Sequence, residues 1–199
     1  MCVSTLTRTR AGPRMAAGSR MNGLADINID RLEIINYPDP RLREACLPVE
    51  AFDDRLGRLI ERLFELMARE RGVGLAAPQI GVPLRLFACN PTGEPEDRRY
   101  YVNPEPVDLE GAVEGDEGCL SIPELTVPIR RAQRCTLRAF DMAGQPVEVR
   151  GEDLEARIWQ HETDHLNGVL IIDKMSPASK IASRRILKKL EEDFRTQRR

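Results

Sequence analysis

Two histidines stand four positions apart in the stretch Gln160-His-Glu-Thr-Asp-His165, and the 199-residue chain contains no others. On an α-helix this spacing puts both imidazole rings on one face, close enough to share a metal ion. Glu162 follows the first histidine and can reach the open side of such an ion, where water binds. The spacing therefore predicts a helix with two metal ligands, His161 and His165, and one proton acceptor.

The competing interpretation is a pair of solvated histidines on a polar helix. Leu154 and Ile158 precede His161 at helical spacing, so we expect this face of the helix to point toward the core. A buried pair of unpaired imidazoles is unfavourable, and a bound metal ion removes that penalty. The surrounding sequence therefore favours metal binding.

A catalytic divalent metal usually takes three protein ligands and leaves one position open. Metzincin proteases place a histidine three residues after the glycine that here is Gly168, but this chain has Ile171 there. Thermolysin-like enzymes use a downstream glutamate, and the glutamates at 191–192 lie in a basic terminal segment. Cysteine thiolate is the remaining strong ligand. Cys119, within Glu117-Gly-Cys-Leu-Ser121, has the most suitable neighbours, because its glycine lets the backbone approach closely and its flanks are polar.

The other cysteines indicate a reducing compartment. The chain has five cysteines, widely scattered and without a CxxC pair, which argues against a disulfide framework. Cys46, Cys89 and Cys135 lie in apolar stretches and are expected to be small core residues, whereas Cys2 belongs to the N-terminal segment. No run approaches the length of a membrane span, so the sequence predicts no membrane segment. The reducing compartment that the cysteines indicate is expected to be the cytoplasm.

Hydrophobic patterns elsewhere predict an α+β fold. Four stretches have strand composition, at 84–88, 100–107, 135–140 and 147–149, with a turn at 141–144 between the last two. Three stretches have helical periodicity, at 53–72, 153–166 and 178–196. Asp53 or Asp54 can cap the first helix, Gly72 ends it, and Asn167-Gly168 ends the second. We expect antiparallel β-sheets packed around the central histidine-bearing helix, with one helix toward the N-terminus and another at the C-terminus.

The apolar faces of the two outer helices follow from the same periodicity. On the first helix they are Leu56, Leu59, Ile60, Leu63, Leu66 and Met67. On the last helix they are Ile181, Ile186, Leu187, Leu190 and Phe194.

Both ends of the chain are basic. Residues 1–25 carry four arginines and no acid, and residues 180–199 carry eight basic residues and three acids. We therefore divide the chain into a disordered or extended leader at 1–26, a folded domain with the metal site at 27–176, and a basic C-terminal helix at 177–199. The leader lacks the apolar segment of a secretory signal. It suits a tail, a start codon assigned too early, or a transit peptide for organellar import.

The segment Gly72-Val-Gly-Leu-Ala-Ala-Pro-Gln79 is rich in small residues. It lacks the glycine spacing and the Gly-Lys-Ser/Thr ending of a phosphate-binding loop. One interpretation is a tightly packed turn. The other is a backbone that approaches a ligand closely, with the Gln79 amide as a donor to a developing oxyanion.

Three stretches together resemble the signature motifs of the peptide deformylase family, in the family's order: GVGLAAPQ (72–79), EGCLS (117–121) and QHETDHLNG (160–168). The resemblance covers roughly residues 30–175, with further support from Val102-Asn-Pro-Glu105 and Asp173. It implies an α+β fold with antiparallel sheets around the HExxH helix. It also implies removal of the formyl group from the N-terminal formylmethionine of newly synthesised polypeptides, with release of formate.

The resemblance assigns a role to each motif. Cys119, His161 and His165 are the implied metal ligands, and Glu162 is the implied general acid/base during attack of a metal-bound water or hydroxide. The implied metal is Fe2+, one per subunit, with Zn2+, Ni2+ or Co2+ as substitutes. Ligand chemistry alone, two imidazoles and a thiolate, would favour zinc.

The resemblance also implies the surroundings of the metal. Gln79 and the backbone N–H of Leu120 are the implied oxyanion hole. Glu117 is expected to pair with an arginine such as Arg131 and so to hold its loop. Trp159 either lines the pocket mouth or packs the helix. The implied pocket for the methionine side chain is formed by Val73, Gly74, Leu154 and Ile158, for which the alternative is ordinary core packing.

The implied partners are N-formylmethionyl nascent peptides, with no membrane. The basic C-terminal helix is either a solvated face or a contact with ribosomal RNA near the peptide exit. Two other functions stay open at this point. An HExxH zinc endopeptidase would take a third ligand other than Cys119, and a non-catalytic metal- or RNA-binding module would give Glu162 no chemical role.

Overall fold

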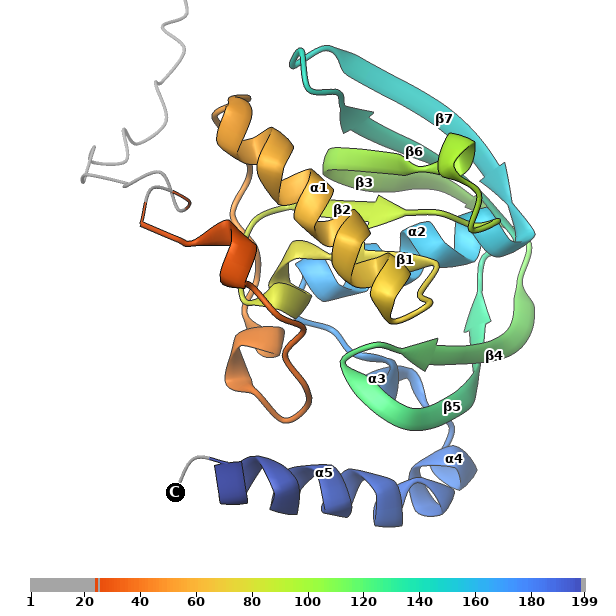
Figure 1. Cartoon of the computed structure of the whole chain (residues 1–199). Helices are drawn as coiled ribbons and strands as arrows, with labels where there is room; N and C mark the ends of the chain where they lie inside the picture. Colours follow the sequence, from red (N-terminus) through yellow and green to blue (C-terminus); the bar gives the residue numbers. More distant parts are fainter. Residues whose placement is uncertain (1–23, 25, 198–199) are drawn as a thin grey trace, which may run out of the picture.

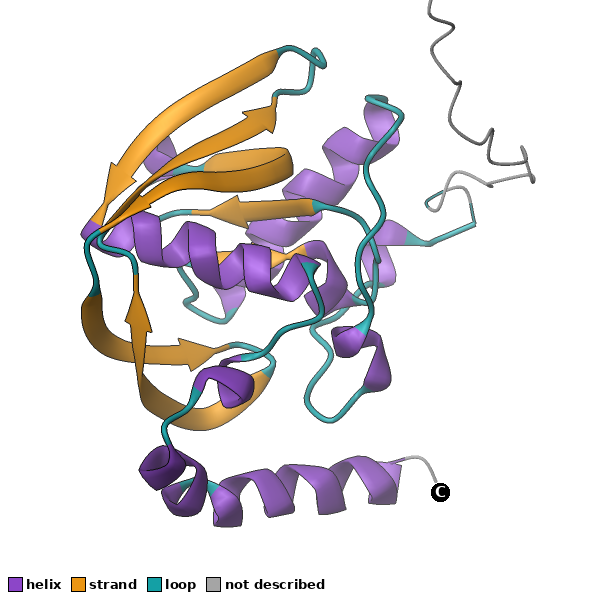
Figure 2. Ribbon diagram, turned by 180° about the vertical axis from the view of Figure 1, so that it is seen from behind, coloured by secondary structure: helices purple, strands orange, loops and turns teal. Residues whose placement is uncertain are grey.

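The structure is a computed structural model that describes Leu24 and residues 26–197, and its fold is α+β, as the sequence predicts. Helices α1 (Asp54–Arg69) and α2 (Asp153–Leu166) lie on opposite faces of a five-stranded antiparallel sheet (Figures 1 and 2). A two-stranded hairpin lies on the far side of α2 from that sheet (Figure 2). Helix α2, which carries both histidines, is therefore enclosed between the two sheets.

The larger sheet has the strand order β1-β2-β3-β6-β7, and all neighbouring strands are antiparallel. Its strands are β1 (Gly74–Ala76), β2 (Leu86–Cys89), β3 (Arg99–Glu110), β6 (Arg134–Phe140) and β7 (Pro146–Glu152). The four predicted strand regions correspond to β2, β3, β6 and β7. Strand β3 tolerates Pro104 because its pairing with β6 shifts register between Val102 and Glu105, where no ladder hydrogen bond is required.

Helix α1 begins and packs as its sequence predicts. The Asp53 carboxylate accepts a hydrogen bond from the Leu56 backbone N–H at 3.0 Å and so caps the helix. All six apolar residues of the predicted face are buried. The end of the helix differs from the prediction: the left-handed residue is Arg71, with φ of 56°, and not Gly72. Gly72 serves close packing, because a Cβ there would lie 2.6 Å from Cδ1 of Leu120.

Helix α2 has the predicted bounds. Its C-terminal stop, Gly168, has φ of 71°, and a Cβ at this position would lie 2.4 Å from the Arg43 carbonyl oxygen. Ile158 and His161 are buried, as the helical spacing predicts. Leu154 is 48% exposed, so the prediction that it continues the buried face is wrong. It lies in the first turn of the helix, at the edge of a cleft.

Trp159 packs α2 against the larger sheet. Its ring is 1% exposed and meets the Tyr101 ring edge-on, with 5.7 Å between the ring centroids. A Cβ on Gly151 of β7 would lie 2.6 Å from the indole, so this glycine makes room for the tryptophan. Of the two expected roles for Trp159, the structure has the packing role.

The hairpin consists of β4 (Val113–Cys119) and β5 (Ile122–Arg131), and the sequence analysis predicts no strand here. Glycines in β4 and prolines in β5 obscure the pattern. The remaining signal is the alternation of Leu125, Val127 and Ile129, all of them buried. A two-stranded sheet has two open edges, so prolines fit where no hydrogen bond is donated.

The single helix predicted at 178–196 is two helices, α4 (Pro177–Ala182) and α5 (Arg184–Gln197), which are preceded by α3 (Ile171–Lys174). The interruption at Ser183 turns α4 out of line with α5 (Figure 1). Ile186, Leu187 and Leu190 pack against the hydrophobic cluster of the hairpin, as predicted. Ile181 is 62% exposed, so its predicted place on the apolar face is wrong.

The predicted leader at 1–26 lies almost entirely outside the described residues, as does Cys2. Leu24, within that range, is buried against the cluster that includes α1. Cys46, Cys89 and Cys135 are buried free thiols, as predicted for core residues. Within the described part of the chain, no helix combines the length and apolarity that crossing a membrane requires.

Candidate active site

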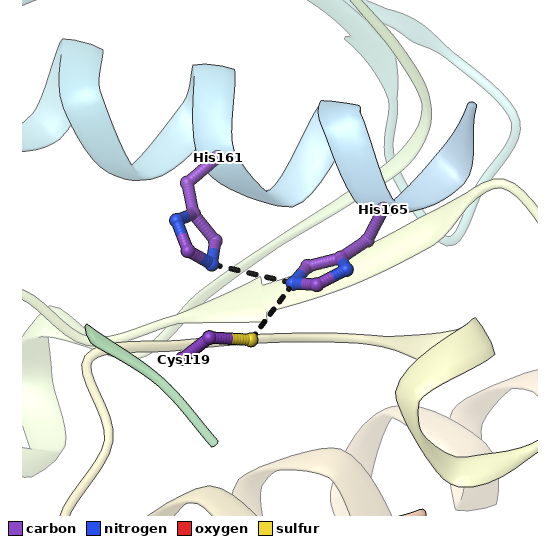
Figure 3. Close-up of side chains that lie close together, drawn as sticks. All are labelled: Cys119, His161 and His165. Atoms are coloured by element: carbon purple, nitrogen blue, oxygen red, sulfur yellow. Dashed lines mark hydrogen bonds between the residues drawn. The ribbon is translucent and has the colours of Figure 1, made fainter. Parts of the chain in front are cut away.

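Three donor atoms from two distant parts of the chain meet beside α2 (Figure 3). His161 Nε2 and His165 Nε2 are 3.2 Å apart, and Cys119 Sγ lies 3.3 Å from His165 Nε2. The histidines come from successive turns of α2, whereas Cys119 comes from the end of β4. All three donor atoms lie within 4.8 Å of one another. The predicted ligands Cys119, His161 and His165 are thus brought together.

This arrangement fits a divalent metal ion. Tetrahedral coordination with metal–N bonds of about 2.05 Å and metal–S bonds of about 2.3 Å separates two nitrogens by about 3.3 Å, and nitrogen from sulfur by about 3.6 Å. The observed separations are close to these values. Two imidazole nitrogens and a thiolate also form a donor set typical of zinc and of first-row transition metals.

The electrostatic surroundings favour a cation where the donor atoms meet. Burial lowers the pKa of His161, but hydrogen bonds to Cys119 and Glu117 outweigh it and raise that pKa to about 10. Burial and the neighbouring charge of His161 hold the pKa of His165 well below its usual range. The surroundings, with Glu117 beside His161, therefore favour positive charge at His161 and disfavour a second one at His165.

Glu162 lies next to the donor atoms and is 4% exposed. Burial raises the pKa of its carboxyl group to about 7, with a further contribution from Glu117. A Cβ on Gly74 would lie 2.3 Å from Glu162 Oε1, so the carboxylate reaches its position only because residue 74 is a glycine. Glu162 Oε2 has no hydrogen-bond partner among the described residues. This oxygen is available to a reactant, and the pKa suits proton transfer near neutral pH.

Gln79 presents its amide nitrogen to the same place. It lies in a 3₁₀ turn (Ala77–Ile80), and its Oε1 accepts a hydrogen bond from the Ala76 backbone N–H at 2.8 Å. Because Oε1 is engaged, Nε2 must point the other way, 3.2 Å from Ser121 Oγ and 3.5 Å from Cys119 Sγ. Of the two interpretations of residues 72–79, this geometry favours the hydrogen-bond donor. Ser121 belongs to the second motif, but its contact with Gln79 could not be predicted from the sequence.

A buried ion-pair network joins the hairpin to α2. Arg131 donates two hydrogen bonds of 2.8 Å to Glu117, as expected, and also contacts Asp164 of α2. Glu117 Oε2 lies 2.9 Å from His161 Nδ1, which orients this ring so that Nε2 faces the other donors. Burial alone would raise the pKa of Glu117, but Arg131 and His161 hold it well below its usual range.

Arg157 belongs to the same network, although it is not among the residues predicted for the site. Its guanidinium donates to Glu117 at 2.7 Å and to the backbone carbonyls of Ile129 and Val113 in the hairpin. It therefore fastens both hairpin strands to α2. The available signal was its position four residues before His161, which places it on the same helix face.

A cleft of about 570 Å³ opens beside the donor atoms, between the hairpin, α2 and the segment from α1 to β1. The expected pocket residues Val73, Gly74, Leu154 and Ile158 all line it, together with Leu120. Val73 and Leu154 are 42% and 48% exposed, so neither is an ordinary core residue. The cleft has the size of a small-ligand or side-chain pocket.

The sequence model of the polypeptide deformylase family matches residues 31–180 of the chain. The chain belongs to this family. A peptide deformylase from Acidothermus cellulolyticus is 46% identical over 156 residues, which cover 78% of this chain and 84% of the relative. A second, from Alkalilimnicola ehrlichii, is 44% identical over 160 residues, with 80% and 90% covered.

Solved structures of peptide deformylases share the fold. The enzyme from Legionella pneumophila is 45% identical, with a TM-score of 0.77 over 84% of this chain and 98% of that one. The enzyme from Plasmodium falciparum is 34% identical, with a TM-score of 0.81 over 82% and 98%. The predicted family and fold class are thus confirmed.

Family membership also confirms the predicted reaction class. The chain is a metal-dependent hydrolase that removes the formyl group from the N-terminus of nascent peptides. Membership of this family favours deformylation over the two other functions that the sequence left open, a zinc endopeptidase and a non-catalytic module. The cysteine and the two histidines form the candidate metal site of this hydrolase.

Proposed function

We propose that the chain deformylates formylmethionyl peptides with Cys119, His161 and His165 as metal ligands and Glu162 as general acid/base. The supporting observation is the convergence of Sγ and two Nε2 atoms beside a buried carboxylate, at the edge of a cleft. The thiolate comes from a hairpin and the imidazoles from a helix, so their meeting is not a consequence of local sequence.

We propose Fe2+ as the resident metal, with Zn2+, Ni2+ or Co2+ able to substitute. The support is membership of a family whose sequence motifs the chain carries, together with a donor set that accepts all four metals. A divalent metal in this position acts as a Lewis acid and makes water nucleophilic near neutral pH.

Glu162 handles the proton in the proposed reaction. Its free Oε2 accepts a proton from the attacking water while the new bond to the formyl carbon forms. The same carboxyl group then gives this proton to the departing amine nitrogen, so that the C–N bond breaks and formate is released. A carboxyl pKa near 7 lets one group do both steps at neutral pH.

Gln79 and the backbone N–H of Leu120 stabilise the negative charge that develops on the formyl oxygen. The hydrogen bond from Ala76 to Oε1 fixes the Gln79 amide before substrate arrives, so little reorganisation is needed during the reaction. Leu120 follows Cys119 directly, which puts its N–H beside the metal ligand. Loss of one such donor typically lowers the rate about 10²- to 10³-fold.

The methionine side chain occupies the cleft, against Val73, Gly74, Leu154 and Ile158. The exposed apolar surfaces of Val73 and Leu154 support this assignment, because a ligand that covers them removes apolar area from water.

Three wider proposals go with this function. The catalytic domain comprises residues 27–176 and is preceded by a leader at 1–26, and the enzyme works in the cytoplasm. The basic segment 177–199 contacts the ribosome. Its support is the charge of α5, where Arg184, Arg185 and Lys188 are exposed. A triple exchange of these three residues for glutamate should abolish co-sedimentation with ribosomes and leave deformylation of short peptides unchanged.

Two variants test the site directly. Cys119→Ala should lose bound metal, whereas Glu162→Gln should keep the metal and lose nearly all formate release from a formylmethionyl tripeptide. Metal analysis of anaerobically purified protein and a formate assay measure both. Full metal content in Cys119→Ala would instead support a zincin-like site with another third ligand. Undiminished formate release by Glu162→Gln would remove the proposed acid/base.

A further inference from the structure

The residue that ends α1 has an unusual backbone conformation. The Gly72 N–H donates to the Met67 carbonyl at 2.9 Å and the Arg71 N–H donates to the Ala68 carbonyl at 3.2 Å. This pair of hydrogen bonds is the Schellman motif, whose left-handed residue is usually glycine or asparagine. Here that residue is Arg71, with φ of 56°. A side chain is therefore kept at a position where the backbone disfavours one.

Backbone strain of this kind is concentrated at functional sites, so the arginine calls for an explanation from its surroundings. The next residue, Gly72, could not exchange places with it, because a Cβ at 72 would lie 2.6 Å from Leu120 Cδ1. The chain therefore has glycine where packing demands it and arginine where helix termination would favour glycine.

Arg71 stands between two hollows. It lines the cleft beside the donor atoms, and it also lines a second hollow of about 670 Å³ between the C-terminal half of α1 and the loop after β2. Arg71, Gly72 and Val73 are common to both. The loop from α1 to β1 (Figure 1) therefore separates the two hollows. A peptide that leaves the cleft on this side would pass over this loop into the second hollow.

The other charges of the second hollow are compensated. Arg98 lies 4.0 Å above the centre of the Phe64 ring and pairs with Glu61 at 2.7 Å. Glu65 pairs with Arg58 and Arg62 on the helix surface. In the described part of the chain, the side chain of Arg71 makes neither an ion pair nor a hydrogen bond. The uncompensated charge at the boundary is therefore positive.

The charges that line the cleft also leave Arg71 as the unpaired positive charge on this side. Glu70 pairs with Arg69 at 2.9 Å, and Glu124 pairs with Lys189 at 3.0 Å. Asp116 has no ion pair among the described residues, but it belongs to β4, on the hairpin wall and not on the wall that Arg71 forms. An acidic side chain of a peptide that leaves the cleft along the wall formed by Arg71 would therefore meet one guanidinium without an ion-pair partner.

We propose that Arg71 forms a subsite for an acidic side chain in the residues that follow formylmethionine, at the second to fourth position of the peptide. This inference rests on the proposed function, because it assumes that the formyl group lies at the donor atoms and the methionine in the cleft. The guanidinium binds the carboxylate by charge-assisted hydrogen bonds. Peptides with aspartate or glutamate at the matching position are the preferred substrates.

The test compares formyl-Met tetrapeptides that carry Asp, Asn or Lys at the second, third or fourth position in turn. Asp and Asn have the same shape, so their kcat/KM ratio isolates the charge. An exposed ion pair corresponds to a ratio of about two to five in favour of Asp at one position. This ratio should shrink when ionic strength rises from about 0.05 to 0.5 M.

Three variants of the metal-loaded enzyme test whether Arg71 causes the preference for Asp over Asn peptides. Arg71→Gly should bring the Asp/Asn ratio to one and raise the melting temperature by about 2–4 °C, since glycine suits the left-handed conformation. Arg71→Glu should reverse the preference in favour of Lys. Arg150→Glu makes the same change in net charge on β7, at the other edge of the sheet, and should leave the ratio unchanged.

A ratio of one at all three positions in the wild-type enzyme overturns the inference, as does a preference for Asp that persists in Arg71→Gly. The Asn peptides separate this failure from failure of the proposed function. Their kcat/KM should be similar in all variants, so hydrolysis of Asn peptides without any charge preference rejects the Arg71 subsite alone. Absence of hydrolysis of every formylated peptide rejects the function on which it rests.

Discussion

Helix α2 and the β4–β5 hairpin both supply metal ligands, but they are held in opposite ways. His161 and His165 are aligned by the local geometry of one helix. Cys119 is placed by long-range contacts, above all the buried pairs of Glu117 with Arg131 and Arg157. The comparison shows that local helix geometry places two of the metal ligands, whereas tertiary contacts place the third. Substitutions should therefore disrupt the position of Cys119 more easily than the alignment of the two histidines.

The largest effect is expected for Arg131→Met, which removes the central cation of the network. Both partners are almost fully buried, with side chains 2% and 4% exposed. A buried carboxylate that loses such a partner typically destabilises a protein by about 3–5 kcal/mol, and the remaining pair with Arg157 places this variant near the lower value. Urea unfolding measures the loss. Metal affinity should also fall about 10- to 100-fold, as for other outer-shell partners of metal ligands.

Arg130→Met is the matched control, because Arg130 is the neighbouring residue on β5 and is exposed. Its free energy of unfolding should change by less than about 0.5 kcal/mol. Equal stability of the two variants would show that the hairpin is held by its apolar cluster and not by the ion pairs.

The next effect concerns the helix side of the site. Gly74→Ala puts a Cβ where Glu162 Oε1 now lies, since the two would be 2.3 Å apart. Displacing the carboxylate by about 1 Å should lower kcat about 10²-fold, while the metal stays bound. Gly118→Ala is the control on the hairpin, because its nearest contact would be an ordinary 3.6 Å. Formate release and metal content distinguish the outcomes, and full activity in Gly74→Ala would contradict the assigned position of Glu162.

The same contrast explains what the sequence could predict. Helix α2, its two histidines and its stop at Gly168 follow from spacing within nine residues, and the structure has all of them. The apolar face of α1 follows from its period in the same way. Residue spacing was enough to predict those features that depend only on the geometry of a single helix.

The failures of prediction are tertiary in origin. The β4–β5 hairpin was missed because its prolines and glycines are tolerated only at the edges of a two-stranded sheet. Arg157 was missed because its partners are backbone carbonyls of distant strands. Arg71 was passed over because Gly72 beside it is the expected helix stop, and only the packing of Leu120 shows why that glycine is needed elsewhere.

A smaller effect is expected where the turn of the hairpin meets Gln79. Ser121→Ala removes the oxygen that accepts a hydrogen bond from Gln79 Nε2 at 3.2 Å. The amide keeps its bond to Ala76 but gains rotational freedom, so kcat/KM should fall roughly tenfold, less than for loss of the donor itself. Ser121→Thr keeps the hydroxyl and should restore most of the rate. An unchanged rate in Ser121→Ala would mean that Ala76 alone orients the amide.

The smallest effect is expected at the start of α3, which follows α2 and where the contacts are exposed. Asp173 of α3 pairs with Arg43 and accepts a hydrogen bond from the Leu170 N–H at 2.8 Å. Partial burial alone would raise the pKa of its carboxyl group, but these two partners outweigh burial and hold the pKa below its usual value of 3.8. The stabilisation is therefore fully present above pH 3.8 and is lost as the pH falls further through the folded-state pKa.

Asp173→Asn should accordingly be less stable than the wild type at pH 7, by less than about 1 kcal/mol because the pair is solvent-exposed. The difference in free energy of unfolding should shrink as the pH falls below 3.8, where the wild-type carboxyl group also becomes neutral. Urea unfolding at pH 7, 5 and 3 measures it. A difference that stays constant over this range would show that the shape of the Asp173 side chain, and not its charge, stabilises the start of α3. The exposed start of α3 would then be held by shape, whereas the hairpin is held by buried ion pairs.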